Sequence, residues 1–97
     1  MYMARVVGSV VATQKDPSLV GKKLMIVQQI NSDQQPVRFE QVAADTVNAG
    51  IGDNVLIVRG AGARRAGARR ADKERDEDQT RDVNDCTIVG IIDRFDK

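Results

Sequence analysis

The sequence contains no histidine, and it contains a single cysteine, Cys86. Without histidine the chain lacks the commonest general base and the commonest protein ligand of transition metals. A lone cysteine excludes a disulfide within the chain and is typical of proteins from a reducing compartment. Because no histidine can lower the pKa of its thiol, we expect Cys86 to be a buried or half-buried structural side chain. These absences argue against an enzyme, a metal site and a bound cofactor.

Long apolar runs and aromatic side chains are also scarce. All apolar runs fall far short of the ~20 residues that cross a bilayer, and Gly8 and Ser9 interrupt the N-terminal one, which favours a strand over a signal peptide. Tyr2, Phe39 and Phe95 are the only aromatic residues, whereas proteins that bind single-stranded nucleic acid depend on aromatic stacking. With 15 Lys and Arg against 14 Asp and Glu, no net field attracts nucleic acid or an anionic membrane. We therefore expect a soluble, cytoplasmic protein without a nucleic-acid or membrane partner.

The length of 97 residues predicts one domain over residues 1–97, with a small core. Short runs rich in Val and Ile, separated by polar turns, predict strands. Asp45 can cap a single helical turn over residues 46–49, which Gly50 would end. The sequence thus predicts a mainly β fold, a small five-stranded, OB-like β-barrel with one short helical turn. The expected strands cover residues 3–13, 23–30, 37–44, 55–59 and 86–95.

Regular alternation assigns the side chains of these strands to two faces. In the first strand it places Gly8 on the same apolar face as Val6. In the last strand it places Ile91 on the face opposite to Ile88.

Two of the expected strands, over residues 55–58 and 88–92, are apolar on both faces. One face can fill the barrel, and the other needs a cover that the chain does not supply as a spare helix. A partner subunit is the natural cover, so self-association has a physical motive. The alternative is that residues 37–41 or the C-terminal tail fold over these faces within the chain.

Residues 61–85 differ in composition from the rest of the chain. The pentapeptide Gly-Ala-Arg-Arg-Ala occurs twice in succession, an acidic mixture follows, and no large apolar residue lies between Val58 and Val83. Such a segment cannot bury enough surface to offset its ordering entropy, which predicts a long flexible charged loop. Its basic part, from Arg64 to Arg70, could contact phosphates, so an OB-like nucleic-acid-binding module is the alternative function. The acidic block beside it would neutralise that charge.

Four segments resemble the vertex-protein family of bacterial microcompartments, which includes carboxysome and ethanolamine-utilisation shell proteins. They are VVATQKDPSLVGKKLMIVQ (10–28), VAADTVNAGIGDNVLIVRG (42–60), GAGAR (60–64) and IVGIIDRF (88–95). The resemblance implies a small β-barrel that forms a homopentamer and caps the five-fold vertices of a shell. It also implies that the partners are further copies of the chain and hexameric shell proteins, within a cytoplasmic compartment.

The segment Gly60, Ala61, Gly62, Ala63 and Arg64 matches a family segment that usually reads Gly-Ser-Ser-Ala-Arg. Ala61 and Gly62 stand in place of the serines, so a hydroxyl-lined role is not expected. The resemblance implies that this segment is a subunit interface or pore loop. We expect Arg64 to project from one end of the barrel, near the adjacent subunit or the symmetry axis.

Overall fold

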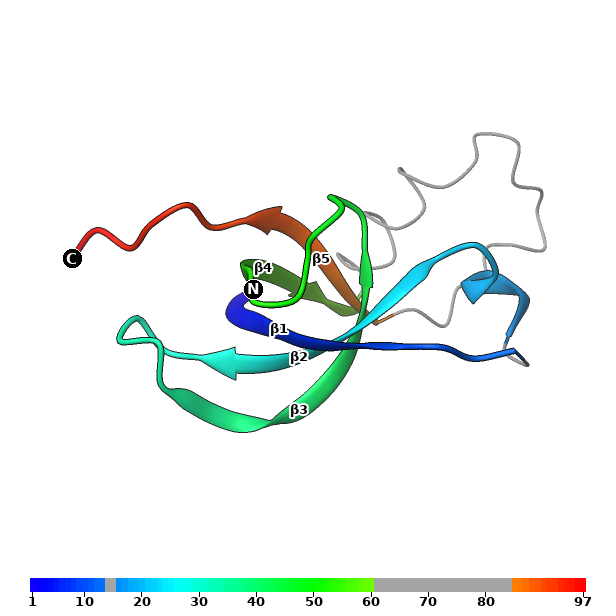
Figure 1. Cartoon of the computed structure of the whole chain (residues 1–97), viewed down its shortest axis with the longest axis horizontal. Coiled ribbons are helices and arrows are strands. Elements are labelled where there is room, and N and C mark those ends of the chain that lie inside the picture. The colour runs from blue at the N-terminus through cyan, green and yellow to red at the C-terminus, as the bar shows by residue number, and fades with distance from the viewer. Residues whose placement is uncertain (14–15, 61–84) are drawn as a thin grey trace.

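The computed structural model describes residues 1–13, 16–60 and 85–97. Their strands form a closed barrel in the order β1-β2-β3-β5-β4, in which only β3 and β5 are parallel neighbours (Figure 1). This confirms the expected mainly β, five-stranded barrel. The strands are β1 (Tyr2–Val10), β2 (Lys23–Ile30), β3 (Pro36–Asp45), β4 (Asn54–Arg59) and β5 (Cys86–Ile91).

The inside of the barrel is filled by apolar side chains from all of its strands. Paired residues that face inward include Val6 with Val27 and Ala4 with Val55, and all of them are buried. Because side chains alternate along a strand, each inward row leaves a second row on the outer surface. The buried apolar core comprises Ala4, Val6, Met25, Val27, Ala43, Ala49, Val55, Ile57, Cys86 and Ile88.

Two β-bulges change the faces that alternation predicts. In β1, Val6 pairs with Val27 but Gly8 already pairs with Ile26, so Gly8 lies on the outer face and not beside Val6. In β5, Ile88 pairs with Ile57 and Ile91 pairs with Val55, so Ile91 returns to the face of Ile88. Both assignments made from regular alternation were therefore wrong. An extra residue shifts every later side chain to the other face.

The expected helical turn over residues 46–49 does not form. The Asp45 carboxylate does accept hydrogen bonds from the N–H groups of Val47 (2.9 Å) and Ala49 (2.7 Å). However, Asn48 adopts a left-handed φ of 61°, which is incompatible with a right-handed helix. The helix that the structure describes is instead the 3₁₀ turn Pro17–Leu19, whose N-cap is Asp16. A connection between the expected strands 3–13 and 23–30 was implied by the sequence, but its helical form was not expected.

The loop between β3 and β4 closes one end of the barrel. Its Ala49 is fully buried in the core, and Gly52 donates to the carbonyl of Val6 at 2.8 Å. The hydroxyl of Thr46 donates to the carbonyl of Ile88 at 2.7 Å, which ties the loop to β5 as well. These bonds anchor the loop to strands on both sides of the barrel.

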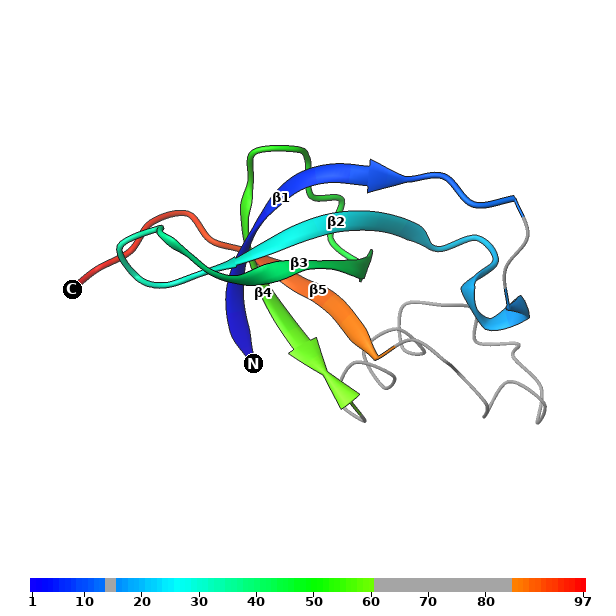
Figure 2. The same ribbon diagram turned by 90° about the horizontal axis from the view of Figure 1, so that it is seen from below.

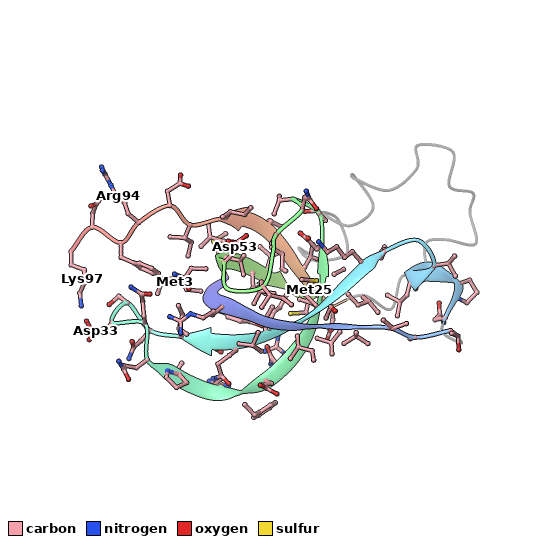
Figure 3. The ribbon with its side chains drawn as sticks, viewed as in Figure 1. Met3, Met25, Asp33, Asp53, Arg94 and Lys97 are labelled. Atoms are coloured by element: carbon pink, nitrogen blue, oxygen red, sulfur yellow. The ribbon has the colours of Figure 1, made fainter. Side chains whose placement is uncertain are left out.

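The connection between β1 and β2 and the hairpin between β2 and β3 project from the barrel in opposite directions (Figures 1 and 2). The last strand ends at Ile91 and not at residue 95 as expected, and residues 92–97 continue as an extended tail. Lys97 at the end of the tail forms an ion pair with Asp33 in the hairpin (Figure 3). Among the residues described, no helix is long and apolar enough to cross a membrane.

Candidate subunit interface

The outer face of β4 is apolar, as the sequence predicted. Leu56 pairs with Met3 on one side and with Gly90 on the other, in a row opposite to the buried Val55 and Ile57. A Cβ built on Gly90 would lie 3.5 Å from Cδ1 of Leu56, so the leucine covers the glycine. The row remains only half-buried in the single chain.

An open groove of about 480 Å³ borders this row where β1 begins and β2 ends. Apolar side chains from four strands and the N-terminus form most of its wall, and Gln29 and Asn31 add polar groups. The alternative of an internal cover does not apply to this groove, because Val37 forms part of its wall and the tail residues 92–97 do not line it. The apolar wall consists of Met1, Met3, Ile30, Val37 and Leu56.

Beside the groove, the phenol of Tyr2 crosses the inside of the barrel. It donates a hydrogen bond to Oε1 of Gln41 in β3 and lies 3.3 Å from Sγ of Cys86 in β5. Burial, and then the contact with Cys86, raise the pKa of the Tyr2 phenol well above its ordinary value. Burial also raises the pKa of the Cys86 thiol, so the thiol stays protonated at neutral pH. The expected buried, structural position of Cys86 is confirmed.

The predicted interface or pore segment begins at Gly60, directly after β4. Gly60 has a φ of 67°, and its N–H donates to the carbonyl of Asp85 at 3.0 Å, so the chain turns out of the barrel here. The other members of the segment, Ala61, Gly62, Ala63 and Arg64, lie outside the described residues. The same is true of most of the loop expected over residues 61–85, including its basic run from Arg64 to Arg70.

Three carboxylates at turns accept hydrogen bonds from backbone N–H groups. Asp16 accepts the N–H of Ser18 at 2.9 Å, and Asp53 accepts the N–H of Gly50 at 2.8 Å. The side chain of Asp45 is fully buried, and besides its two backbone donors its Oδ2 lies 3.6 Å from Nζ of Lys23. Among the residues described, no group of three or more Asp, Glu or Cys side chains could hold a metal ion.

Sequence reasoning missed an open edge on β3. Among the described residues, this strand pairs with β2 along nearly its whole length, but with β5 only at Ala44 and Asp45. Residues 36–40 are all exposed, and Phe39 keeps 74% of its surface. The sequence did contain a signal for an edge strand, since Pro36 and the opposite charges of Arg38 and Glu40 are typical of such strands.

Comparison with known proteins assigns the chain to a family. A family model described as "Ethanolamine utilisation protein EutN/carboxysome" matches residues 1–93. The chain belongs to this EutN/CcmL family. The bacterial microcompartment shell vertex protein PduN from Salmonella typhimurium is 38% identical over 97 residues, which cover 96% of each chain. The carboxysome shell vertex protein CcmL from Nostoc sp. is 47% identical over 94 residues, which cover 96% of this chain and 83% of CcmL.

Solved structures agree with this assignment of the EutN/CcmL chain. The GrpN pentameric microcompartment shell protein from Rhodospirillum rubrum matches with a TM-score of 0.81 and 34% identity, over 100% of this chain and 99% of GrpN. CcmL from Gloeobacter violaceus matches with a TM-score of 0.77 and 39% identity, over 96% and 86% of the two chains. The resemblance seen in the sequence is confirmed. These relatives support a shell vertex function and not the nucleic-acid alternative.

Proposed function

We propose that this chain is a structural protein of a bacterial microcompartment shell, and that five copies form a ring that caps a five-fold vertex. The observation that carries the proposal is the uncovered apolar groove beside Met3 and Leu56, in a barrel that matches the pentameric GrpN over its whole length. An apolar surface of this kind indicates a protein contact. No catalytic role is assigned to any residue.

A cyclic ring requires two different surfaces on each copy, one for each neighbour. We place the groove on one of these two surfaces, where side chains of the next subunit would fill it. A five-fold ring then occupies the positions that a shell of six-fold tiles needs in order to close. Hexameric shell proteins are therefore the proposed partners of the outer rim, and the bacterial cytoplasm is the proposed location of the shell.

The segment Gly60, Ala61, Gly62, Ala63 and Arg64 is proposed as the second contact of the ring. Gly60, the first residue of this segment, follows β4 directly and has a left-handed φ of 67°. A guanidinium in this position can pair with a carboxylate or carbonyl groups of the adjacent copy and fix the angle between subunits. Arg64→Ala should then weaken the ring, whereas Arg69→Ala and Arg70→Ala should not. Equal effects of all three on dissociation by dilution would remove the special role of Arg64.

The groove is tested by placing a charge within it. Leu56→Arg should dissociate the ring, because a desolvated charge without a partner opposes burial of the surface. Val11→Arg is the matched control, since Val11 is also apolar and 91% exposed but lies after β1, on the projecting connection. A ring that survives Leu56→Arg and dissociates with Val11→Arg would contradict the proposal, because the contact would then lie at the connection after β1 and not at the groove.

A further inference from the structure

The open edge of β3 offers backbone groups that nothing in the described chain pairs with along most of the strand. Because β5 reaches β3 only at Ala44 and Asp45, the β3 backbone before Ala44 has one edge without a ladder partner. An edge of this kind accepts an extended segment as an additional strand. Pro36 has no N–H and marks where such pairing would stop.

The C-terminal tail is a second segment with an unpaired backbone. Residues 92–97 are extended in Figure 1 and contain neither Gly nor Pro. Among the described residues, the one backbone hydrogen bond of the tail is from the N–H of Ile92 to the carbonyl of Asn54, at 2.8 Å. Two ion pairs involve its side chains, Arg94 with Asp96 within the tail and Lys97 with Asp33 of the hairpin. All four side chains are more than half exposed, so these pairs contribute little to holding the tail in this position.

We propose that the tail of a second copy of this chain adds to the open edge of β3 as an antiparallel strand. The proposal rests on the ring of the proposed function and identifies two of the surfaces that meet in it. Charge complementarity between the tail and β3 supports this proposal. In the antiparallel register that places Phe39 opposite Phe95, Arg38 lies opposite Asp96 and Glu40 lies opposite Arg94.

The same register also matches the apolar residues. Val42, which is 49% exposed, lies opposite Ile92, and Phe39, which is 74% exposed, gains an aromatic partner in Phe95. Opposite charges and aromatic pairs directly across antiparallel strands are the pairs that stabilise a sheet. A shift by one residue would place Arg38 opposite Phe95 and lose both charge pairs, so the sequence favours this register.

The added strand would continue the surface that the groove begins. Val37 belongs both to β3 and to the groove wall, so groove and edge lie side by side on one copy. The tail belongs to the other copy. Edge and tail are different surfaces, which is what a cyclic ring requires of its two contacts.

Cysteine cross-linking tests which strands meet. A Phe39→Cys chain mixed with a Phe95→Cys chain should give a disulfide between the two chains, because residues directly opposite on antiparallel strands lie within reach of the bond. The native Cys86 is only 5% exposed and does not compete. Val7→Cys mixed with Phe95→Cys is the control and should give none, since Val7 lies on the outer face of β1. Failure of the 39–95 pair to link, or a doubly substituted chain that links only within itself, would overturn the proposal.

A charge exchange tests the register. Glu40→Arg and Arg94→Glu should each raise the concentration at which the ring dissociates, by roughly 3- to 10-fold. The two changes combined in one chain should restore the wild-type value. Additive losses would contradict the pairing.

The wild-type mass separates this proposal from the proposed function. A pentamer that shows neither the cross-link nor the restoration removes the tail contact and leaves the vertex function standing. A wild-type monomer contradicts both, because it leaves no second copy to provide a tail.

Discussion

The phenol oxygen of Tyr2 lies 3.3 Å from Sγ of Cys86, so a side chain of β1 reaches β5 through the interior, next to the two-residue contact between β3 and β5. The same phenol donates to Gln41 of β3. Tyr2 therefore connects the two strands that share the shortest ladder in the barrel. Its position at the edge of the apolar groove links the closure of the barrel to the proposed contact surface.

Tyr2→Phe should lower the free energy of unfolding by about 1–2 kcal/mol, because Gln41 loses a donor inside the barrel while the ring still packs. Urea unfolding measures the change. Val11→Ala is the control on an exposed side chain away from the proposed contacts and should cost less than about 0.5 kcal/mol. A Tyr2→Phe variant as stable as the wild type would show that the phenol contacts are incidental.

Stability should fall at alkaline pH. The pKa values of Tyr2 and Cys86 are raised in the folded chain, so the unfolded chain loses these protons first, near pH ~8.5 for the thiol and ~10 for the phenol. Their contribution is therefore complete below about pH 8 and is lost as the pH rises through these values. Urea unfolding from pH 7 to 11 should show a steeper decline for wild type than for Tyr2→Phe above pH ~10. Identical slopes would contradict the assignment.

Asp45→Ala should destabilise the chain by about 2–4 kcal/mol, because two N–H groups of the closing loop lose their acceptor and Lys23 loses its counter-charge. The carboxylate is fully buried, and its bonds to Val47 and Ala49 hold the loop that seals the barrel. Thermal unfolding gives the comparison. Val20→Ala, at an exposed side chain of the connection between β1 and β2, is the control and should be neutral. A loss of equal size there would count against the role of the loop.

Gly21→Val should cost about 1–2 kcal/mol through the backbone alone. Gly21 has a φ of 83°, and a Cβ built there meets nothing within 4 Å, so sterics with neighbouring groups do not contribute. Gly21→Asn should cost clearly less, since Asn tolerates the left-handed region. Equal melting temperatures for wild type and Gly21→Val would mean that the turn relaxes without strain.

The barrel could be predicted from sequence where each strand follows a simple rule. The second strand was expected over the bounds Lys23–Ile30 that the structure has, because its apolar and polar residues are flanked by clear turn signals. The faces of Gly8 and Ile91 were predicted wrongly, because β-bulges beside glycines add a residue that regular alternation does not include. The prediction of a helical turn after Asp45 was wrong, because Asn48 adopts a left-handed φ. The Asp45 carboxylate therefore caps a loop, and its presence in the sequence does not distinguish a loop from a helix.

The candidate site was only partly accessible to sequence reasoning. The two-faced apolar strand at Leu56 predicted an uncovered surface, and the groove confirms it. The network of Tyr2, Gln41 and Cys86 joins residues that are 39 and 84 positions apart, and only the closed barrel brings them together. The open edge of β3 depends on where β5 begins, although Pro36 and the charges of Arg38 and Glu40 were a local sign of an edge strand.

The mass of the wild-type chain in solution tests the central claim most directly. Sedimentation equilibrium at micromolar concentration should give five times 10.6 kDa, about 53 kDa, for a ring in which each groove meets a neighbour. The Leu56→Arg variant under the same conditions should shift toward 10.6 kDa. A wild-type chain that stays at 10.6 kDa would contradict the vertex ring.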